Sequence, residues 1–415
     1  MPFASNRTIR TKIPDTCVSG IFSLFLHTFS CNLFHLCYNG SNNLMEVLIM
    51  KLTLTEKAKS LGIRQDMLDT ALVSAGNPAK IAAVMRKALS GQRITIGVIG
   101  GSVTHGASAT IKENSYAGLL RKWWEDTFPM STISYINAGY SGTSSLLGVH
   151  RVDDMLLSHN PDFVLVEFAV NDIIQDFQAE TYASLLHKIL TADCAPAVMT
   201  LFVMNEGGIN AQADQQPICA HYDLPMISYR DAVWPEVKTE QNPDGQYIWR
   251  DICADWVHPT DKGHAIVGEF VTSYLTEVYK ALDEISTDLP EIPAPYRPYT
   301  FKDAKWYHCG NTEPVSMGSF KVFQKECCSW QNEGEEPLVI KVSGKRIILP
   351  ICTPYSDNLK MTVKVDGVEK SLPEYIIRGG IFTNFIILDD AEVGEHIVEI
   401  IPNGDTVWCG GLLVS

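Results

Sequence analysis

Residues 94–106 read ITIGVIGGSVTHG, a short apolar run that passes directly into a glycine-rich turn. The first seven residues have the β-branched, almost entirely apolar composition of a buried strand. The glycines of the turn allow backbone conformations that other residues avoid, so the turn can present Ser102 at the carboxyl end of that strand. The turn lacks both the lysine of a phosphate-binding loop and the GxGxxG spacing of a dinucleotide-binding turn. We therefore expect Ser102 to carry the chemistry of this turn.

The alternation of strand and helix continues on both sides of this stretch. Further strands are predicted at 132–138, 162–170, 196–204 and 223–229, and helices at 78–89, 115–128, 145–159, 179–190 and 262–282. Short β-branched runs separated by amphipathic stretches are typical of a parallel sheet with helices on both faces. We predict an α/β fold with a doubly wound, five-stranded parallel sheet over residues 50–287. This domain is expected to begin with a helical lead-in and to contain a polar loop at 205–217.

The period of the apolar pattern changes to two in the last part of the chain. Residues 288–299 are rich in proline and are predicted to form a semi-rigid linker. Strands with alternating apolar and polar residues are predicted at 338–352, 361–372, 381–390 and 396–402. Asp366-Gly367 is typical of a two-residue hairpin turn. Residues 300–415 are therefore predicted to form a small antiparallel β-sandwich.

The composition excludes several classes of protein. The chain has 415 residues, 33 basic and 48 acidic side chains, and a formal net charge of −15. This balance argues against a nucleic-acid partner, because phosphate binding requires a basic surface. No apolar run has the length of a membrane-spanning helix, which argues against stable membrane insertion. The cysteines include no CxxC pair, which favours reduced cytosolic thiols over a zinc site or a disulfide framework.

The first residues differ in character from the rest. Residues 1–44 contain a basic start and a short apolar run that His27 interrupts. One interpretation is a degenerate secretory signal, which would predict a secreted protein. We favour the other, in which translation starts at Met45 or Met50 and the protein is cytoplasmic. In both cases residues 1–49 are not expected to be part of the fold.

Three later features fall near the ends of predicted strands or the start of the last helix. NAGYSGTSS places Gly142 in a turn where its backbone N–H can approach a substrate oxygen. VEFAVND contains Asn171, whose carboxamide can donate a hydrogen bond to a developing oxyanion. DWVHPTDKGH places Asp255 three residues before His258, so that a carboxylate oxygen can hold a ring nitrogen of the histidine. Each feature alone is more often structural, but their combination with Ser102 indicates a catalytic site.

These four blocks resemble those of the SGNH hydrolases, the esterase and lipase superfamily that is also called GDSL. The residues that name this family match Ser102, Gly142, Asn171 and His258 in order and spacing. The resemblance covers residues 90–280 and implies a flavodoxin-like three-layer α/β/α fold. It also implies that no metal or organic cofactor takes part.

The resemblance further implies acyl transfer to a serine. Ser102, His258 and Asp255 are the expected catalytic triad. The backbone N–H groups of Ser102 and Gly142 and the side chain of Asn171 are the expected oxyanion hole.

Two positions depart from the family pattern. The usual Gly-Asp-Ser reads Gly100-Gly101-Ser102, which removes an acid beside the nucleophile. The usual glycine two residues before the block asparagine is Ala169. Neither departure affects a residue that performs the chemistry.

The substrate is specified less clearly than the chemistry. The polar loop at 205–217 favours a small acyl group on a hydrophilic alcohol over a long acyl chain. Trp256 and Trp249 are candidates to stack on a sugar ring, with plain packing as the alternative. His105 is a candidate substrate contact or an exposed bystander. Trp306 is a candidate for a glycan cleft or for packing between the domains.

An SGNH domain joined to a β-sandwich resembles two-domain carbohydrate acetylesterases, including bacterial mannan O-acetylesterases. We therefore predict a serine esterase that removes acetyl groups from O-acetylated oligosaccharides such as mannan or xylan fragments. The alternatives are a short-chain acyl ester or thioester hydrolase, a lysophospholipase, and a non-catalytic glycan-binding protein. The expected partner is the small-molecule or oligosaccharide ester, and a homo-oligomer is compatible with the sequence.

Overall fold

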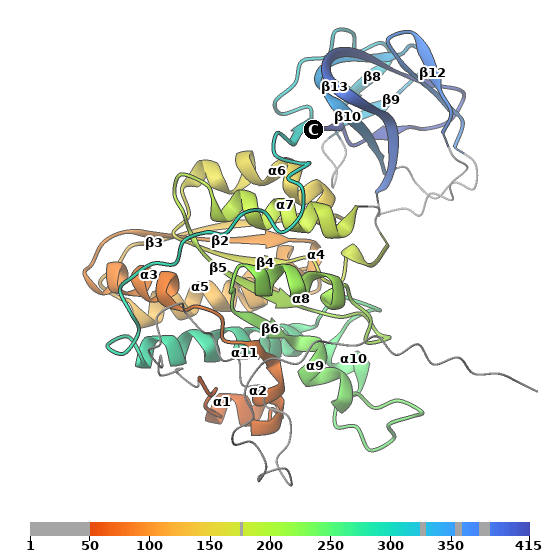
Figure 1. The fold of residues 1–415 in the computed structure, drawn as a ribbon. Coiled ribbons are helices and arrows are strands. Elements are labelled where there is room, and N and C mark those ends of the chain that lie inside the picture. Colours follow the sequence, from red (N-terminus) through yellow and green to blue (C-terminus); the bar gives the residue numbers. More distant parts are fainter. Residues whose placement is uncertain (1–49, 175–176, 324–328, 353–358, 373–381) are drawn as a thin grey trace, which may run out of the picture. The chain divides into compact units, whose positions relative to one another are not determined.

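The computed structural model describes residues 50–415 apart from 175–176, 324–328, 353–358 and 373–381 (Figure 1). The predicted internal start and the alternative signal fall on residues 1–49 and lie outside the described residues. Within the described part, no helix combines the length and the apolar character needed to cross a membrane.

A six-stranded sheet forms the centre of the first domain. Its strands are β1 (Leu72–Ser74), β2 (Ile94–Gly100), β3 (Ile133–Gly139), β4 (Phe163–Glu167), β5 (Ala197–Phe202) and β6 (Met226–Ser228). They lie in the order β1-β6-β5-β4-β2-β3, and all neighbours from β3 to β6 are parallel. Without β1, this is the strand order of flavodoxin-like sheets, which bind ligands at the carboxyl ends of their strands. The predicted doubly wound parallel sheet is confirmed.

The sequence does not predict the edge strand β1, which lies in the lead-in that we expect to be helical. Two helices form there, α1 (Glu56–Ser60) and α2 (Gln65–Ala71), and the chain then pairs antiparallel with β6. Three half-buried residues are too few to show a strand period. The prediction of five strands is therefore one strand short.

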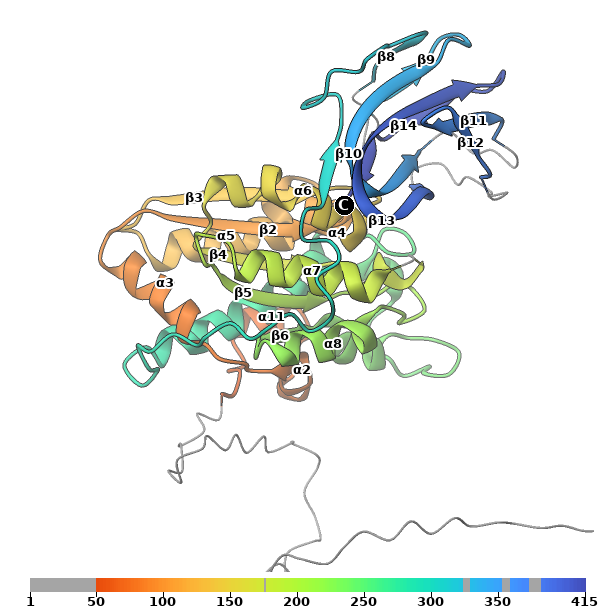
Figure 2. The same ribbon diagram turned by 45° about the horizontal axis from the view of Figure 1, so that its top comes forward.

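Helices cover both faces of the sheet (Figures 1 and 2). The remaining α-helices are α3 (Ala79–Leu89), α4 (Ser102–His105), α5 (Tyr116–Thr127), α6 (Ser145–Met155), α7 (Gln178–Leu190), α8 (Gln212–His221), α9 (Tyr229–Val233), α10 (Trp249–Ile252) and α11 (Asp261–Lys280). Short 3₁₀ helices are η1 (Lys112–Asn114), η2 (Leu157–His159), η3 (Asp172–Ile174) and η4 (Trp234–Glu236). α3, α5 and α11 share one core with Ile96 and Leu165 of the sheet. α6, α7 and α8 share the other with Ile99 and Val166, which gives the three expected layers.

The predicted loop at 205–217 is wrong from residue 212 onward, where α8 begins. Pro217 lies inside this helix, and proline is rare in helix interiors, so the sequence conceals it. Ile218 and Cys219 are buried against the sheet and hold the helix in place. The helix is therefore stabilised by tertiary packing, which its own residue pattern does not predict.

Three helices near the carboxyl edge of the sheet begin at capping hydroxyl groups. The side chains of Ser115, Ser144 and Thr260 each accept a hydrogen bond from a backbone N–H in the first turn of α5, α6 and α11. Such a cap typically contributes about 1 kcal/mol to stability. These caps fix the points at which the helices begin.

A separate antiparallel sheet forms the C-terminal domain. Its strands are β7 (Lys305–Tyr307), β8 (Phe320–Val322), β9 (Trp330–Asn332), β10 (Leu338–Ile351), β11 (Met361–Val365), β12 (Val368–Lys370), β13 (Thr383–Pro402), β14 (Trp408–Cys409) and β15 (Leu412–Val414). The order is β12-β11-β13-β10-β14-β9-β8, and β15 pairs with both β10 and β7. Asp366 and Gly367 both have positive φ, as a two-residue hairpin turn requires. The predicted fold class of this domain is confirmed.

The strands predicted at 381–390 and 396–402 are parts of one strand, β13, within the described residues. Its pairing with β10 shifts register near Gly344 and again near Ile348. Such irregularities bend a strand without ending it. The residues between the two predicted strands therefore belong to a continuous strand with shifted pairing instead of a loop.

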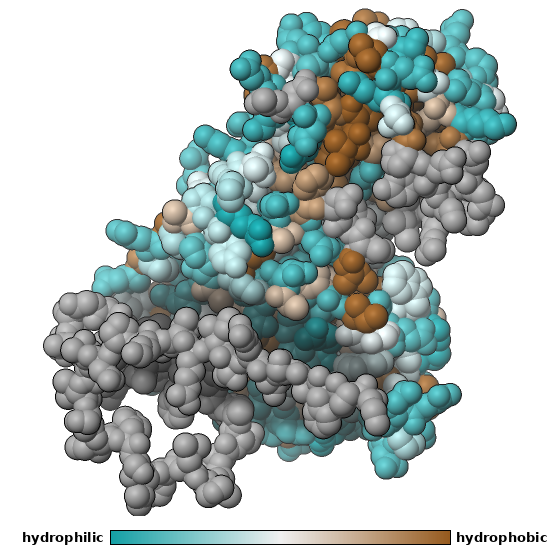
Figure 3. Space-filling view, turned by 45° about the vertical axis from the view of Figure 1, so that its right-hand side comes forward, coloured by the Kyte–Doolittle hydropathy of each residue, from teal (hydrophilic) through white to brown (hydrophobic). Residues whose placement is uncertain are grey.

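Apolar side chains join the C-terminal sheet to α6. Trp306 and Leu413 are buried in the same cluster as Leu147 of α6. The ring of Trp306 also meets the ring of Tyr140 edge-on, with centroids 5.7 Å apart. Other apolar residues of this sheet face solvent, and Figure 3 shows brown atoms on the visible face of the domain. The large ones in its strands are Val322, Val368, Ile386 and Val393.

Candidate active site

Ser102 is the first residue of the four-residue helix α4, which follows directly after β2. Its side chain is 7% exposed and lies at the carboxyl edge of the sheet, next to the positive end of that short helix. The N–H of His105 donates to Gly101 O and the N–H of Ala107 donates to Ser102 O. These bonds close the turn, and Gly106 ends it with a positive φ of 84°. The sequence therefore presents this serine on a tight turn after a strand, as expected.

His258 connects Ser102 to Asp255. Its Nε2 atom lies 2.8 Å from Ser102 Oγ, and its Nδ1 atom lies 2.6 Å from Asp255 Oδ2. Because a carboxylate only accepts, Nδ1 carries the hydrogen of the neutral ring and Nε2 is left as the acceptor for the serine hydroxyl. The three residues that the sequence singles out thus form one continuous hydrogen-bond chain.

Hydrogen bonds fix the turn that contains Asp255. Asp255 Oδ1 accepts from the backbone N–H groups of Val257 and His258, at 2.9 and 2.8 Å. The indole N–H of Trp249 donates to Asp255 O at 2.7 Å. Partial burial works to raise the pKa of Asp255, but the hydrogen bonds from the His258 ring and from the two N–H groups outweigh it and lower the pKa. Asp255 is therefore held as a carboxylate.

Asn171 lies against the serine turn. A Cβ atom added to Gly101 would lie only 2.3 Å from Asn171 Oδ1, so a residue with a side chain cannot replace this glycine without moving the amide. Asn171 Oδ1 is buried and has no hydrogen-bond partner among the described residues. This contact gives a physical reason for Gly101 where the family pattern has aspartate.

Gly142 lies in the turn between β3 and α6 and has a φ of 72°, which favours glycine.

Arg151 of α6 braces the neighbouring strand ends. It is 1% exposed, and its guanidinium donates to Ala138 O and Gly100 O, the latter at 2.9 Å. Arg151 belongs to none of the predicted site motifs, although its position four residues after Leu147 on an apolar helix face is a visible signal.

Two acids at the end of β4 are also missed as site residues. Glu167 and Asp172 are fully buried, on either side of the Asn171 turn. Burial raises the pKa of Glu167 to about 8, with a further contribution from the charge of Asp172. Burial also raises the pKa of Asp172 to about 7, although hydrogen bonds from Ser145 and Gln215 oppose it. Neither acid contacts Ser102 or His258 through a hydrogen bond that the structure contains within its described part.

The four candidate substrate residues differ in exposure. Trp256 is 47% exposed and follows Asp255 directly. Trp249 and Trp306 are 6% and 4% exposed, and their indole N–H groups donate to Asp255 O and Gly410 O. This burial speaks against a ring face open to a sugar at either residue. His105 Nδ1 lies 3.2 Å from Ser141 Oγ, and burial followed by the charge of Lys112 lowers the pKa of His105.

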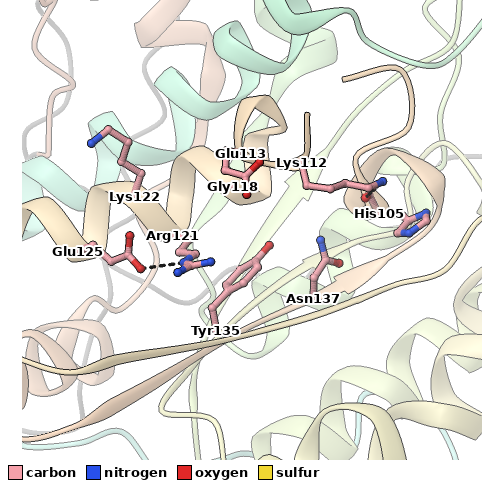
Figure 4. Close-up of a pocket in the computed structure, with 9 residues that line it drawn as sticks. All are labelled: His105, Lys112, Glu113, Gly118, Arg121, Lys122, Glu125, Tyr135 and Asn137. Atoms are coloured by element: carbon pink, nitrogen blue, oxygen red, sulfur yellow. Dashed lines mark hydrogen bonds and ion pairs between the residues drawn. The ribbon is translucent and has the colours of Figure 1, made fainter. Parts of the chain in front are cut away.

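His105 also marks one end of an open cavity of about 510 Å³ (Figure 4). The cavity runs along the edge strand β3, between Tyr135 and Asn137 of that strand and Arg121 of α5. Figure 4 shows the guanidinium of Arg121 beside the Tyr135 ring, where it also pairs with Glu125. The lining includes neither Ser102 nor the other two residues of its hydrogen-bond chain.

A smaller cavity of about 10 Å³ lies at Gly142, with room for about one water molecule. Pro350, Phe382 and Asn384 of the C-terminal part of the chain share its lining with the Gly142 turn. Across the described residues, no group of three or more His, Cys, Asp or Glu side chains is arranged to hold a metal ion.

The hydrogen-bond chain of Ser102, His258 and Asp255 thus lies at the carboxyl edge of a flavodoxin-like sheet, where such sheets bind their ligands. Residues 98–266 match the model of the GDSL-like Lipase/Acylhydrolase family, and this match includes all four blocks that the sequence singles out. The resemblance to SGNH hydrolases is thereby confirmed.

Comparison with solved structures extends the likeness to both domains. Two crystal structures of a two-domain esterase (CEX) active on acetylated mannans, one of them with mannopentaose, are 28% identical to this chain. Each covers 84% of this chain, which spans 97% and 98% of the two solved chains, with TM-scores of 0.71 and 0.72. Thioesterase 1/protease 1/lysophospholipase L1 of Escherichia coli strain K12 is 26% identical over 175 residues, 39% of this chain and 81% of that protein. Together with the family match, these similarities show a carboxylic ester hydrolase.

Proposed function

We propose that this enzyme removes acetyl groups from O-acetylated oligosaccharides through a covalent acyl-enzyme on Ser102. The observation that carries the proposal is the hydrogen-bond chain from Asp255 through His258 to Ser102. The likeness to an esterase active on acetylated mannans over both domains supports the choice of substrate.

The first half of the reaction forms the acyl-enzyme. His258 Nε2 takes the proton of Ser102 Oγ while Oγ attacks the acetyl carbonyl carbon. The carbonyl π electrons move to its oxygen, which becomes the oxyanion. When this intermediate collapses, the bond to the sugar oxygen breaks and His258 returns the proton to the departing sugar hydroxyl. In the second half, water gives a proton to His258 Nε2 and attacks the acyl carbon. The bond from that carbon to Ser102 Oγ then breaks, His258 returns the proton to Oγ, and acetate leaves.

Three donors are proposed to stabilise the oxyanion. They are the N–H groups of Ser102 and Gly142 and the amide Nδ2 of Asn171. The Asn171 amide lies against Gly101 with its Oδ1 atom buried, which supports this role, because a preorganised donor needs no rearrangement during the reaction. Asp255 is proposed to keep the Nδ1 hydrogen in place and to stabilise the imidazolium that forms on His258.

The C-terminal domain is proposed to complete the substrate site. Phe382 and Asn384 of that domain line a small cavity together with the Gly142 turn, which supports this role. Trp256 remains the proposed sugar contact, because its side chain is half exposed beside Asp255.

We retain residues 50–287, 288–299 and 300–415 as the proposed hydrolase domain, linker and accessory domain. With translation starting at Met45 or Met50, the proposed compartment is the cytoplasm.

The test is acetate release from acetylated mannan, acetylated xylan and acetylated monosaccharides, measured beside Ser102→Ala with mass spectrometry of the products. We expect loss of acetyl mass from at least one glycan, absent in the variant. An active Ser102→Ala enzyme would refute the nucleophile. Cleavage of octanoyl nitrophenyl esters without release from any glycan would favour the alternative acyl hydrolase, which the similarity to an E. coli thioesterase and lysophospholipase supports.

A further inference from the structure

The buried carboxylate of Asp172 has no place in the mechanism above. Taking an ionised carboxylate out of water costs several kcal/mol unless strong donors compensate. Asp172 has two such donors. Its Oδ1 accepts from the backbone N–H of Ser145, and its Oδ2 accepts from Gln215 Nε2, both at 2.8 Å.

The position of these bonds relates the two turns of the oxyanion hole. Asp172 follows Asn171 directly, so the carboxylate is attached to the Asn171 turn. Ser145 is the first residue of α6, three residues after Gly142. The bond from Ser145 N–H to Asp172 therefore joins the turn of one oxyanion donor to the turn of the other. The positive end of α6 adds a favourable interaction with the negative charge.

The surroundings of Asp172 keep this link rigid. Ser145 Oγ lies 2.7 Å from Thr181 Oγ1 of α7, so the amino-terminal turn of α6 is tied to a second helix. Gln215 belongs to α8 and is 1% exposed, so it approaches the carboxylate from a third helix. The carboxylate thus lies where three helices meet behind the oxyanion turns.

We propose that Asp172 is a positioning residue that holds the Asn171 turn against the Gly142 turn, so that both donors face the same developing oxyanion. The proposal rests on the proposed function, because it concerns the oxyanion hole of that same site. A displacement of about 1 Å in catalytic geometry can cost on the order of 100-fold in rate. Loss of the link should therefore lower kcat and leave KM nearly unchanged, since the oxyanion exists only in the transition state.

The experiment compares Asp172→Ala with Asp172→Asn and with Asp162→Ala. Asparagine keeps an acceptor for Ser145 N–H, and its amide can donate to Gln215 Oε1, which has no partner among the described residues. Asp162 is a matched control at the opposite end of β4, because it also accepts from one backbone N–H, that of Thr95, and one side chain, that of Lys87. It lies far along the strand from the carboxyl edge, so its loss changes stability without touching the oxyanion turns.

We expect a fall of about 100-fold in kcat for Asp172→Ala on 4-nitrophenyl acetate at pH 8, with KM within about threefold of the parent enzyme. Asp172→Asn should recover to within about tenfold, and Asp162→Ala should keep the parent kcat even where its melting temperature falls. Gln215→Ala, a milder change, should lower kcat by about tenfold and keeps the test decisive if Asp172→Ala does not fold.

The proposal is overturned by a folded Asp172→Ala or Gln215→Ala enzyme with parent kcat. It is equally overturned if Asp162→Ala loses as much kcat as Asp172→Ala at the same fraction folded. An enzyme that cleaves 4-nitrophenyl acetate but no acetylated glycan would refute the proposed substrate alone. The variant ratios on the nitrophenyl ester then still decide the role of Asp172.

Discussion

The chain contains two Asp–His pairs with nearly the same local geometry. In one, Asp255 Oδ2 lies 2.6 Å from His258 Nδ1 and Oδ1 accepts from a backbone N–H. In the other, Asp366 Oδ2 lies 2.8 Å from His396 Nδ1 and Oδ1 accepts from the backbone N–H of Ile397. The first pair belongs to the hydrolase domain and the second to the C-terminal sheet.

The pairs differ at the far nitrogen of the ring. His258 Nε2 faces Ser102 Oγ at 2.8 Å, and the side chain is 25% exposed. His396 Nε2 is buried and has no hydrogen-bond partner in the described part of the chain. An acid that orients a histidine is thus a common structural device. It becomes a candidate catalytic device only where the free nitrogen meets a nucleophile at a site that substrate can reach.

The largest expected contrast is between the two histidines. His258→Ala should lower kcat on 4-nitrophenyl acetate by on the order of 10⁶-fold, because no base remains for Ser102. His396→Ala should keep kcat within about twofold, since its ring touches no reacting group. Steady-state kinetics on both variants, with circular dichroism to verify folding, measure the contrast. Comparable losses in the two variants would break the distinction between the pairs.

Asp255→Asn should have the next largest effect, on the order of 10⁴-fold in kcat. The amide of asparagine donates to Nδ1, which moves the ring hydrogen to Nε2 and removes the acceptor for the serine proton. The variant should keep its melting temperature within a few degrees. A kcat within tenfold of the parent would show that the tautomer of His258 is fixed by something other than Asp255.

Asn171→Ala tests the surroundings that only the first pair has. Loss of one oxyanion donor typically costs about 10²–10³-fold in kcat, with little change in KM. The measurement is the kcat and KM of the folded variant on 4-nitrophenyl acetate. An increase in KM with unchanged kcat would instead make Asn171 a ground-state binding residue.

The smallest effect is expected at Asp366, in stability. The hydrogen bond from His396, followed by that from Ile397 N–H, lowers the pKa of Asp366 below its ordinary value of 3.8. A lowered folded-state pKa stabilises the protein above pH 3.8, and this contribution disappears as the pH falls through the folded-state value. Asp366→Asn should therefore lose about 0.2–1 kcal/mol at pH 7, measured by urea unfolding, and match the parent protein near pH 2. A difference that persists at pH 2 would contradict this origin.

The strand ends could be predicted from the sequence because they coincide with its strongest patterns. The strand at 94–100 is predicted with the same bounds as β2, and Ser102 follows it directly. The spacing of Asp255 and His258 is local, so it can be read without knowing the fold. The proximity of these residues to Ser102 required only the rule that parallel strands present their carboxyl ends at one edge.

What the sequence conceals depends on contacts between distant residues. Pro217 hides α8, which packing on the sheet stabilises. The burial of Trp249 and Trp306 follows from the bonds of their indole N–H groups to Asp255 O and Gly410 O, which no local pattern encodes. In the sequence, Asp172 is an ordinary polar residue after a strand. Its bond to the first residue of α6 is visible only in the folded structure.

The pairing of β15 with β7 has a consequence for biosynthesis. Leu412 pairs with Tyr307, roughly a hundred residues earlier in the chain. The first strand of this sheet therefore cannot form its pairing with the last strand until that strand has been synthesised. At typical translation rates of about 5–20 residues per second, the wait is about 5–20 s. The parallel sheet, whose strands end at Ser228, is complete in the nascent chain before then. The C-terminal sheet should therefore be the last part to acquire its native pairing and the part most dependent on protection during synthesis.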